Sequence, residues 1–146
     1  LAIKPGQIVL DIGCGWGGMA IYLARKYDVQ VHGITLSEEQ IALAKQRAEA
    51  AGVADRTRFE LVDYRHLDGR GLTYDRIVSV GMFEHVGTPQ FDTFFRTCAN
   101  LLRDDGVMLL HTIGRMGTPG FTDAFTDKYI FPGVYIPALS ETVQAS

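Results

Sequence analysis

A glycine-rich segment that follows the first apolar run could bind a nucleotide-like ligand. It reads Asp11-Ile12-Gly13-Cys14-Gly15-Trp16-Gly17-Gly18. Glycine lets a backbone turn tightly and approach a ligand where a Cβ would intrude. The spacing satisfies the G-x-G-x-x-G pattern of dinucleotide-binding folds and also a D-x-G-x-G-x-G pattern. The carboxylate of Asp11 suits a ligand with a cationic end better than a pyrophosphate. Cys14 is predicted to pack in the interior, because no histidine lies nearby in sequence to activate its thiol.

The residues after the second apolar run argue against a dinucleotide. Dinucleotide-binding folds place an acidic residue at the end of the second strand, where it binds a ribose hydroxyl. This chain has Gly33-Ile34-Thr35-Leu36-Ser37 there, and the next acid, Glu38, belongs to the following helix. An NAD(P)-dependent oxidoreductase is therefore only a remote alternative.

Two further side chains could serve acid–base chemistry. Glu84 follows the apolar stretch Val80–Phe83, where an unpaired carboxylate would be costly. His111 ends the apolar run Val107–Leu110 and is expected at the same edge of a sheet. The alternatives are a surface glutamate and a core histidine. His85 is expected to point away from Glu84 if the segment is extended, and no histidine has a partner at metal-ligand spacing, so no metal site is predicted.

Short apolar runs alternate with helical patterns along the whole chain, which predicts an α/β fold with a parallel sheet. Strands are expected over residues 8–12, 29–35, 57–62, 75–80 and 107–112. Helices are expected over residues 19–27, over 38–51 with a capping box from Ser37 to Gln40, and from Thr88-Pro89 to residue 102. Asp104-Asp105-Gly106 predicts a turn, and residues 114–146 a loop or lid that holds a short helix starting near Ser140. Ligands of such sheets bind at the carboxyl ends of the strands.

Composition narrows the function classes further. The formal charge is −3 and the pI about 5.8, which argues against nucleic acid as a partner. No apolar run reaches the roughly 18–20 residues of a transmembrane segment. The chain has no secretory signal pattern and only 2 cysteines, which favours a cytoplasmic location.

The glycine segment resembles the first motif of class I S-adenosylmethionine-dependent methyltransferases. Its tryptophan and paired glycines are similar to those of the cyclopropane-fatty-acyl-phospholipid synthases and mycolic acid cyclopropane synthases. The resemblance extends over essentially the whole chain, and the long segment Tyr74–Gly87 is the most specific. The similar segments are Gly33–Ser37 with Gln40, Asp63-Tyr64-Arg65, Tyr74–Gly87, Leu110–Gly114, and Tyr129–Gly133 with Pro137.

The resemblance implies a set of cofactor-binding residues. Asp11, Gly13, Cys14, Gly15, Trp16 and Gly17 would lie by the methionine part of S-adenosylmethionine, Thr35, Leu36 and Gln40 along its ribose, and Asp63 and Tyr64 by its adenine. From the residues alone, Gln40 could instead complete the capping box, Asp63 could be a turn residue, and Tyr64 could belong to the core.

The resemblance also implies a reaction. An alkene of an unsaturated phospholipid acyl chain takes the sulfonium methyl group, and proton loss from the resulting carbocation closes a cyclopropane ring. A bicarbonate ion acts as the base, held by Glu84, His111 and the backbone of Ile113. The rival function is N-methylation of a small amine, because certain plant N-methyltransferases share the Phe-Glu-His motif.

The resemblance finally implies a Rossmann-like class I methyltransferase domain over residues 1–146 that is incomplete at both ends and lacks the last two strands. Ligands of the ion contributed by the family's other segments would lie outside this chain. The enzyme would work at the inner face of the membrane without spanning it. Because the apolar run Val107–Leu110 would form an open sheet edge, the chain is also expected to self-associate.

Overall fold

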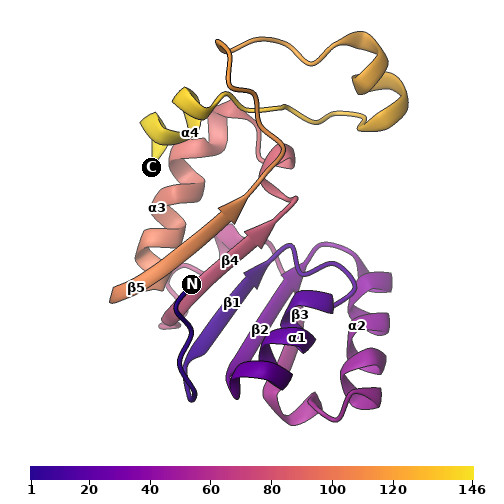
Figure 1. The fold of residues 1–146 in the computed structure, drawn as a ribbon, viewed down its shortest axis with the longest axis vertical. Coiled ribbons are helices and arrows are strands. Elements are labelled where there is room, and N and C mark those ends of the chain that lie inside the picture. Colours follow the sequence, from indigo (N-terminus) through magenta and orange to yellow (C-terminus); the bar gives the residue numbers. More distant parts are fainter.

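A parallel sheet of five strands organises the protein, and the computed structural model describes all residues 1–146. The strands are β1 (Ile8–Ile12), β2 (Gln30–Thr35), β3 (Thr57–Leu61), β4 (Tyr74–Val80) and β5 (Leu102–His111). Their order is β3-β2-β1-β4-β5, and every neighbouring pair is parallel (Figure 1). The predicted α/β fold is confirmed. β2 and β3 lie on one side of β1, whereas β4 and β5 lie on the other side, so the strand order switches between β1 and β4. Folds of this kind bind ligands at that switch point.

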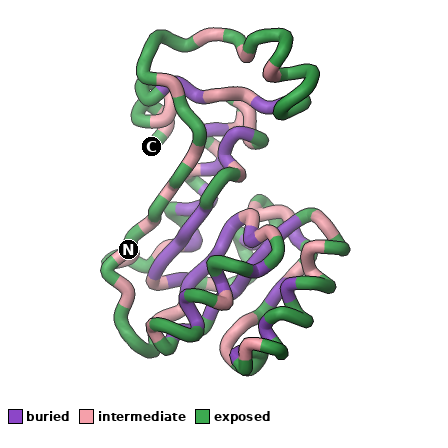
Figure 2. Tube along the Cα trace, turned by 45° about the vertical axis from the view of Figure 1, so that its right-hand side comes forward, coloured by how far each residue is buried: buried purple, intermediate pink, exposed green.

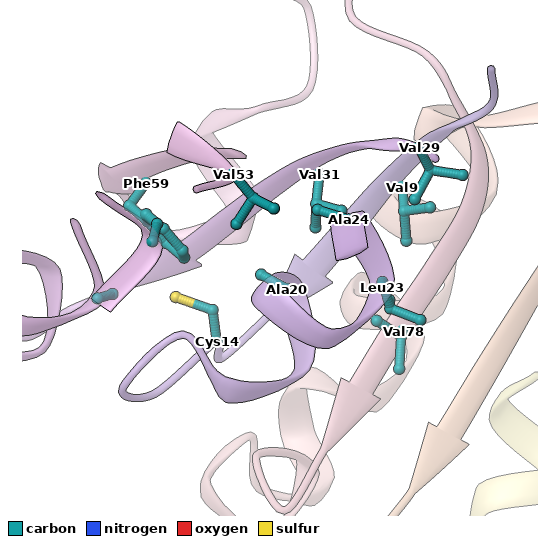
Figure 3. Close-up of a cluster of buried hydrophobic side chains, with 12 residues drawn as sticks. Val9, Cys14, Ala20, Leu23, Ala24, Val29, Val31, Val53, Phe59 and Val78 are labelled. Atoms are coloured by element: carbon teal, nitrogen blue, oxygen red, sulfur yellow. The ribbon is translucent and has the colours of Figure 1, made fainter. Parts of the chain in front are cut away.

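Side chains that alternate along the strands build two separate cores. On one face, Val9 and Val31 pack with Ala20 and Leu23 of α1 (Gly18–Tyr27), as Figure 3 shows, and with α2 (Glu38–Ala50). On the other face, a cluster that includes Leu10 packs against α3 (Phe91–Leu101). A period of two along each strand thus separates the helices into two layers. No helix combines the length and the apolar character needed to cross a bilayer.

The start of β5 differs from the prediction. Tyr74 pairs with Leu102 and Arg76 with Val107, so two residues of β4 span the same distance as five of β5. The predicted turn at residues 104–106 is wrong, because the sheet absorbs these residues as an irregularity within an edge strand.

The start of α3 also differs. A 3₁₀ turn (Thr88–Gln90) with Pro89 in its first positions precedes the helix, and Thr88 makes no capping hydrogen bond through its side chain. The other predicted strand and helix limits agree with the structure to within one or two residues.

Residues 114–138, here called the flap, leave the sheet after β5 and return to α4 (Leu139–Ala145), which packs beside α3 (Figure 1). The only helical turn within them spans Thr126–Ile130. Arg115 joins the two ends of the flap: its N–H donates to Pro137 O at 2.9 Å, and its side-chain Nε donates to Ile136 O at 3.1 Å. Most of the flap is exposed (Figure 2).

The free edge of β5 predicts self-association of the 146-residue chain. β5 pairs only with β4, and Val107 and Leu109 are 43% and 40% exposed. An open edge pairs readily with another chain where it carries no charge, as over residues 107–110 of β5. We expect light scattering to show oligomers that Leu109→Lys reduces. Leu61→Lys on the opposite edge strand serves as control and should have no effect, because Arg58 and Glu60 already charge β3. A monodisperse unaltered monomer would contradict this prediction.

Candidate functional site

A cavity of about 410 Å³ opens at the carboxyl ends of the strands, beside the switch in strand order between β1 and β4. We call it the switch-point cavity. Its wall comes from four segments, each of which follows or ends one strand. The lining residues are Ile12, Gly13, Ile34, Thr35, Leu36, Gln40, Val62, Asp63, Tyr64, Arg65, Gly81, Met82, His85, Val86 and Gln90. Six of the residues implied to bind the cofactor therefore meet in one small-molecule-sized cavity.

The glycine loop is fixed to the end of β2. The N–H groups of Gly13 and Cys14 both donate to Ile34 O, at 3.0 and 2.9 Å. Gly13 has φ +77°, and a Cβ there would lie 2.8 Å from Cβ and Cγ of Met82. The loop can therefore approach Met82 only because residue 13 is glycine.

The rest of the loop lies outside the cavity lining. Gly17 also has φ +77°, and a Cβ there would lie 2.9 Å from Cβ of Ala44, so this glycine lets α1 begin close to α2. Gly15 has open space around it, and Trp16 is 48% exposed. Among the glycines of the loop, the structure brings only Gly13 into contact with the switch-point cavity.

Asp11 and Cys14 are buried beneath the loop. Burial raises the pKa of Asp11 to about 7, although the backbone N–H of Ala20 opposes the shift. Its Oδ2 has no hydrogen-bond partner. Burial and the charge of Asp11 raise the pKa of Cys14 to about 12, so its thiol stays protonated at neutral pH. The side chain of Cys14 lies among core residues in Figure 3, as its predicted packing role requires.

Thr35 and Gln40 form a hydrogen-bonded pair at the cavity wall. Thr35 Oγ1 donates to Gln40 Oε1 at 2.5 Å. Ser37 Oγ accepts from the backbone N–H of Gln40 at 3.2 Å and so caps α2. The Gln40 side chain does not return to the N–H of Ser37, so only half of the predicted capping box forms. Leu36, 73% exposed, lies beside the pair at the cavity.

The segment after β3 contributes an acid, an aromatic ring and a base. Asp63 accepts from Arg65 Nε at 3.0 Å and Nη2 at 2.6 Å, and hydrogen bonds from Arg65 are the largest cause that lowers the pKa of Asp63. The ring of Tyr64 packs edge-on against Phe94, with centroids 5.2 Å apart, while it also lines the cavity. Tyr64 thus belongs both to the core and to the cavity wall.

Glu84 is buried, with 6% of its surface exposed, and is not a surface residue. Its Oε1 accepts from the N–H of Ile113 at 2.6 Å, and its main-chain oxygen accepts from the N–H of Tyr135 at 2.9 Å. Its Oε2 is buried without a hydrogen-bond partner. One side chain therefore connects the segment after β4 with the end of β5, and one of its carboxyl oxygens has no hydrogen-bond partner.

The two histidines of the region line different cavities. His85 lines the switch-point cavity and Glu84 does not, so the two residues have different surroundings, although the segment is not extended. Residues 83–85 form a 3₁₀ turn rather than an extended segment, so successive side chains are not opposed. His111 is exposed and lines another cavity, between the end of β5 and α4. The structure does not place His111 in the cavity that Gly13 lines.

Sequence reasoning assigned no role to three polar residues of the cavity wall: Arg65, His85 and Gln90. Arg65 stood in a recognised motif, and its spacing of two from Asp63 is the signal that could have identified the pair. His85 and Gln90 lie in the two 3₁₀ turns on either side of Gly87. The sequence pattern did not predict these turns, so it could not place the two side chains.

Comparisons with known proteins agree on one family. A family model described as "Mycolic acid cyclopropane synthetase" matches residues 1–146. The cyclopropane-fatty-acyl-phospholipid synthase of Escherichia coli K12 is 47% identical over 146 residues, which are 100% of this chain and 36% of that protein. The chain thus spans about a third of that relative's length.

Solved structures show the same relationship. The cyclopropane synthase MmaA2 from Mycobacterium tuberculosis superposes with a TM-score of 0.85 at 32% identity, over 100% of this chain and 55% of that one. The mycolic acid cyclopropane synthase CmaA1, complexed with SAH and CTAB, gives a TM-score of 0.84 at 34% identity, over 99% and 54% of the two chains.

Replacement of Gly13 tests the cavity as a cofactor site. Gly13→Val should weaken binding of S-adenosylhomocysteine more than tenfold by calorimetry, because the valine would collide with Met82 and its φ is unfavourable. Gly18→Ala is the control, since nothing lies within 4 Å of a Cβ there. Unchanged affinity in Gly13→Val would show that the ligand binds elsewhere.

The pKa of Asp11 predicts a pH dependence of stability. The folded state raises this pKa from 3.8 to about 7, so it binds the proton more tightly than the unfolded chain does. The stability that the protonated group contributes is therefore lost as the pH rises from about 4 to about 7. Relative to Asp11→Asn, the wild type should lose up to about 4 kcal/mol over this range.

The measurement is urea unfolding at several pH values. Asp55→Asn, at an exposed position, is the control and should parallel the wild type. A wild-type curve that also parallels Asp11→Asn would refute the raised pKa.

Proposed function

This chain belongs to the mycolic acid cyclopropane synthetase family, and from that premise we propose that it serves methyl transfer from S-adenosylmethionine to the double bond of an unsaturated phospholipid acyl chain, with formation of a cyclopropane ring. The observation that carries the proposal is the buried, half-satisfied carboxylate of Glu84, which does not line the switch-point cavity itself but lies between two residue pairs that do, Gly81-Met82 and His85-Val86.

The residues of the cavity fit the cofactor. Its volume of about 410 Å³ suits a small molecule. Glycine at position 13 lets the loop that lines it lie against Met82, where a Cβ would collide. In the proposed assignment, the glycine loop holds the methionine part, Thr35, Leu36 and Gln40 hold the ribose, and Asp63 and Tyr64 hold the adenine. When bound, S-adenosylmethionine supplies an electrophilic methyl group on a sulfonium.

Glu84 has the chemistry to hold a hydrogen-bond donor near the reacting carbon atoms. Its Oε2 is an acceptor that is removed from water and lacks a donor, which is costly unless a ligand satisfies it. The hydroxyl of a bicarbonate ion fits this requirement. Glu84 would then orient the ion as the base that removes the proton in ring closure.

Ile113 and His111 are the other two residues of the proposed ion site, and the geometry supports them less than it supports Glu84. The N–H of Ile113 already donates to Glu84 Oε1, so a bound ion shares or replaces that contact. His111 is exposed two residues before it. We include both residues in the proposed site on the family resemblance, and Glu84 on its geometry as well.

The aromatic core next to Glu84 supports a reaction that must exclude water. Phe83 is fully buried and stacks on Phe91 with centroids 4.4 Å apart, directly beside Glu84 in sequence. Water in this region would trap a carbocation before the ring closes, so a dry surround serves the chemistry. We propose a cytoplasmic enzyme that meets its lipid at the inner face of the membrane.

A second candidate function is methyl transfer to the nitrogen of an amine. His85 favours it, because this residue lines the switch-point cavity and could accept the proton of the amine. Product analysis separates the two functions: a lipid that gains one CH₂ and loses its alkene, or a methylated amine. An NAD(P) site has less support, since no acidic residue of the β2 end lines the cavity.

Replacement of Glu84 tests the proposed reaction. Glu84→Gln keeps the shape of the side chain but removes its charge, so cofactor affinity should persist while turnover falls roughly 30- to 1,000-fold. The assay is conversion of unsaturated phospholipid by the protein that carries this chain. Glu49→Gln, on the exposed face of α2, is the matched control. Full lipid activity in Glu84→Gln would exclude the proposed ion site.

A further inference from the structure

Arg65 holds the Asp63 carboxylate at the wall of the switch-point cavity. Three donors of this one residue reach it: the backbone N–H and Nε both bond Oδ1, at 2.9 and 3.0 Å, and Nη2 bonds Oδ2 at 2.6 Å. No other residue donates a hydrogen bond to this carboxylate. The orientation of Asp63 therefore depends on Arg65 alone.

This arrangement leaves part of Asp63 free for a ligand. Oδ1 accepts two hydrogen bonds and Oδ2 accepts only one, so Oδ2 keeps a free acceptor position. Asp63 and Arg65 both line the cavity, but the Asp63 side chain is only 13% exposed, whereas the Arg65 side chain is 50% exposed. The pair thus presents a fixed, ionised carboxylate, which is purely an acceptor, to whatever fills this end of the cavity.

We propose that Arg65 is a positioning residue that sets the selectivity of this site for a purine with an exocyclic amino group. The inference rests on the proposed function, which places the adenine beside Asp63 and Tyr64. The amino group donates to the free acceptor position of Oδ2, and a purine without that group leaves this position desolvated and without a donor. Arg65 touches neither the reacting atoms nor the amino group, and acts through Asp63.

The test compares two ligands by calorimetry: S-adenosylhomocysteine and its 6-deamino analogue, which has hydrogen in place of the amino group. The wild type should prefer S-adenosylhomocysteine by roughly 10- to 100-fold, the range for a hydrogen bond to a charged group. Arg65→Ala should reduce this preference to a few-fold and leave the affinity for the analogue nearly unchanged. Arg65→Lys, which cannot make the forked contact, should lie in between.

Arg58→Ala is the matched control, since Arg58 pairs with Glu60 two residues away but lies outside the switch-point cavity. It should keep the wild-type preference. Equal weakening of both ligands by Arg65→Ala, or a wild type without preference, would overturn the role of Arg65 and leave the proposed function standing. Failure of the wild type to bind S-adenosylhomocysteine would instead contradict the proposed function, and this inference with it. Thermal unfolding of each variant identifies a general loss of structure.

Discussion

The carbonyl of Ile34 carries the constraint on which the site depends. It accepts the N–H groups of both Gly13 and Cys14, so one atom at the end of β2 fixes the path of the loop that leaves β1. The adjoining Thr35 then holds Gln40, and the loop faces Met82 after β4 at a distance that only glycine permits. Three strand ends are thereby locked around one cavity, and the parallel sheet brings the end of β3 to the same edge.

The second constraint is the burial of charge. Asp11 and Glu84 each have one carboxylate oxygen removed from water without a partner, and both lie next to strand ends at this edge. A fold built only for stability would pair such atoms or leave them out. Glu84 also joins the segment after β4 to Ile113 and, through its main chain, to Tyr135 of the flap. Glu84 therefore connects three segments: the one after β4, the end of β5 and the flap.

Much of the fold could be predicted from the sequence because its signals are local. The apolar run of Ile8–Ile12, the glycines after it and the Ser37 cap each specify an element within a few residues. The bulge at the start of β5 could not be predicted. Its Asp-Asp-Gly sequence is equally typical of a turn, and an edge strand can accommodate such extra residues without ending. The cavity was predicted as a set of residues but not as contacts: the Thr35–Gln40 and Asp63–Arg65 pairs arise from side chains that meet only in the folded chain.

The positions of His85 and His111 also could not be predicted from the sequence. The sequence favours His111 over His85, but a 3₁₀ turn places His85 at the cavity while His111 remains exposed beside α4. The most direct test of the account is a crystal structure of the protein with bound S-adenosylhomocysteine. The account predicts adenine beside Tyr64, ribose beside Gln40 and the amino-acid end at Gly13. A ligand in the cavity between β5 and α4, or with its ribose at Glu38, would contradict it.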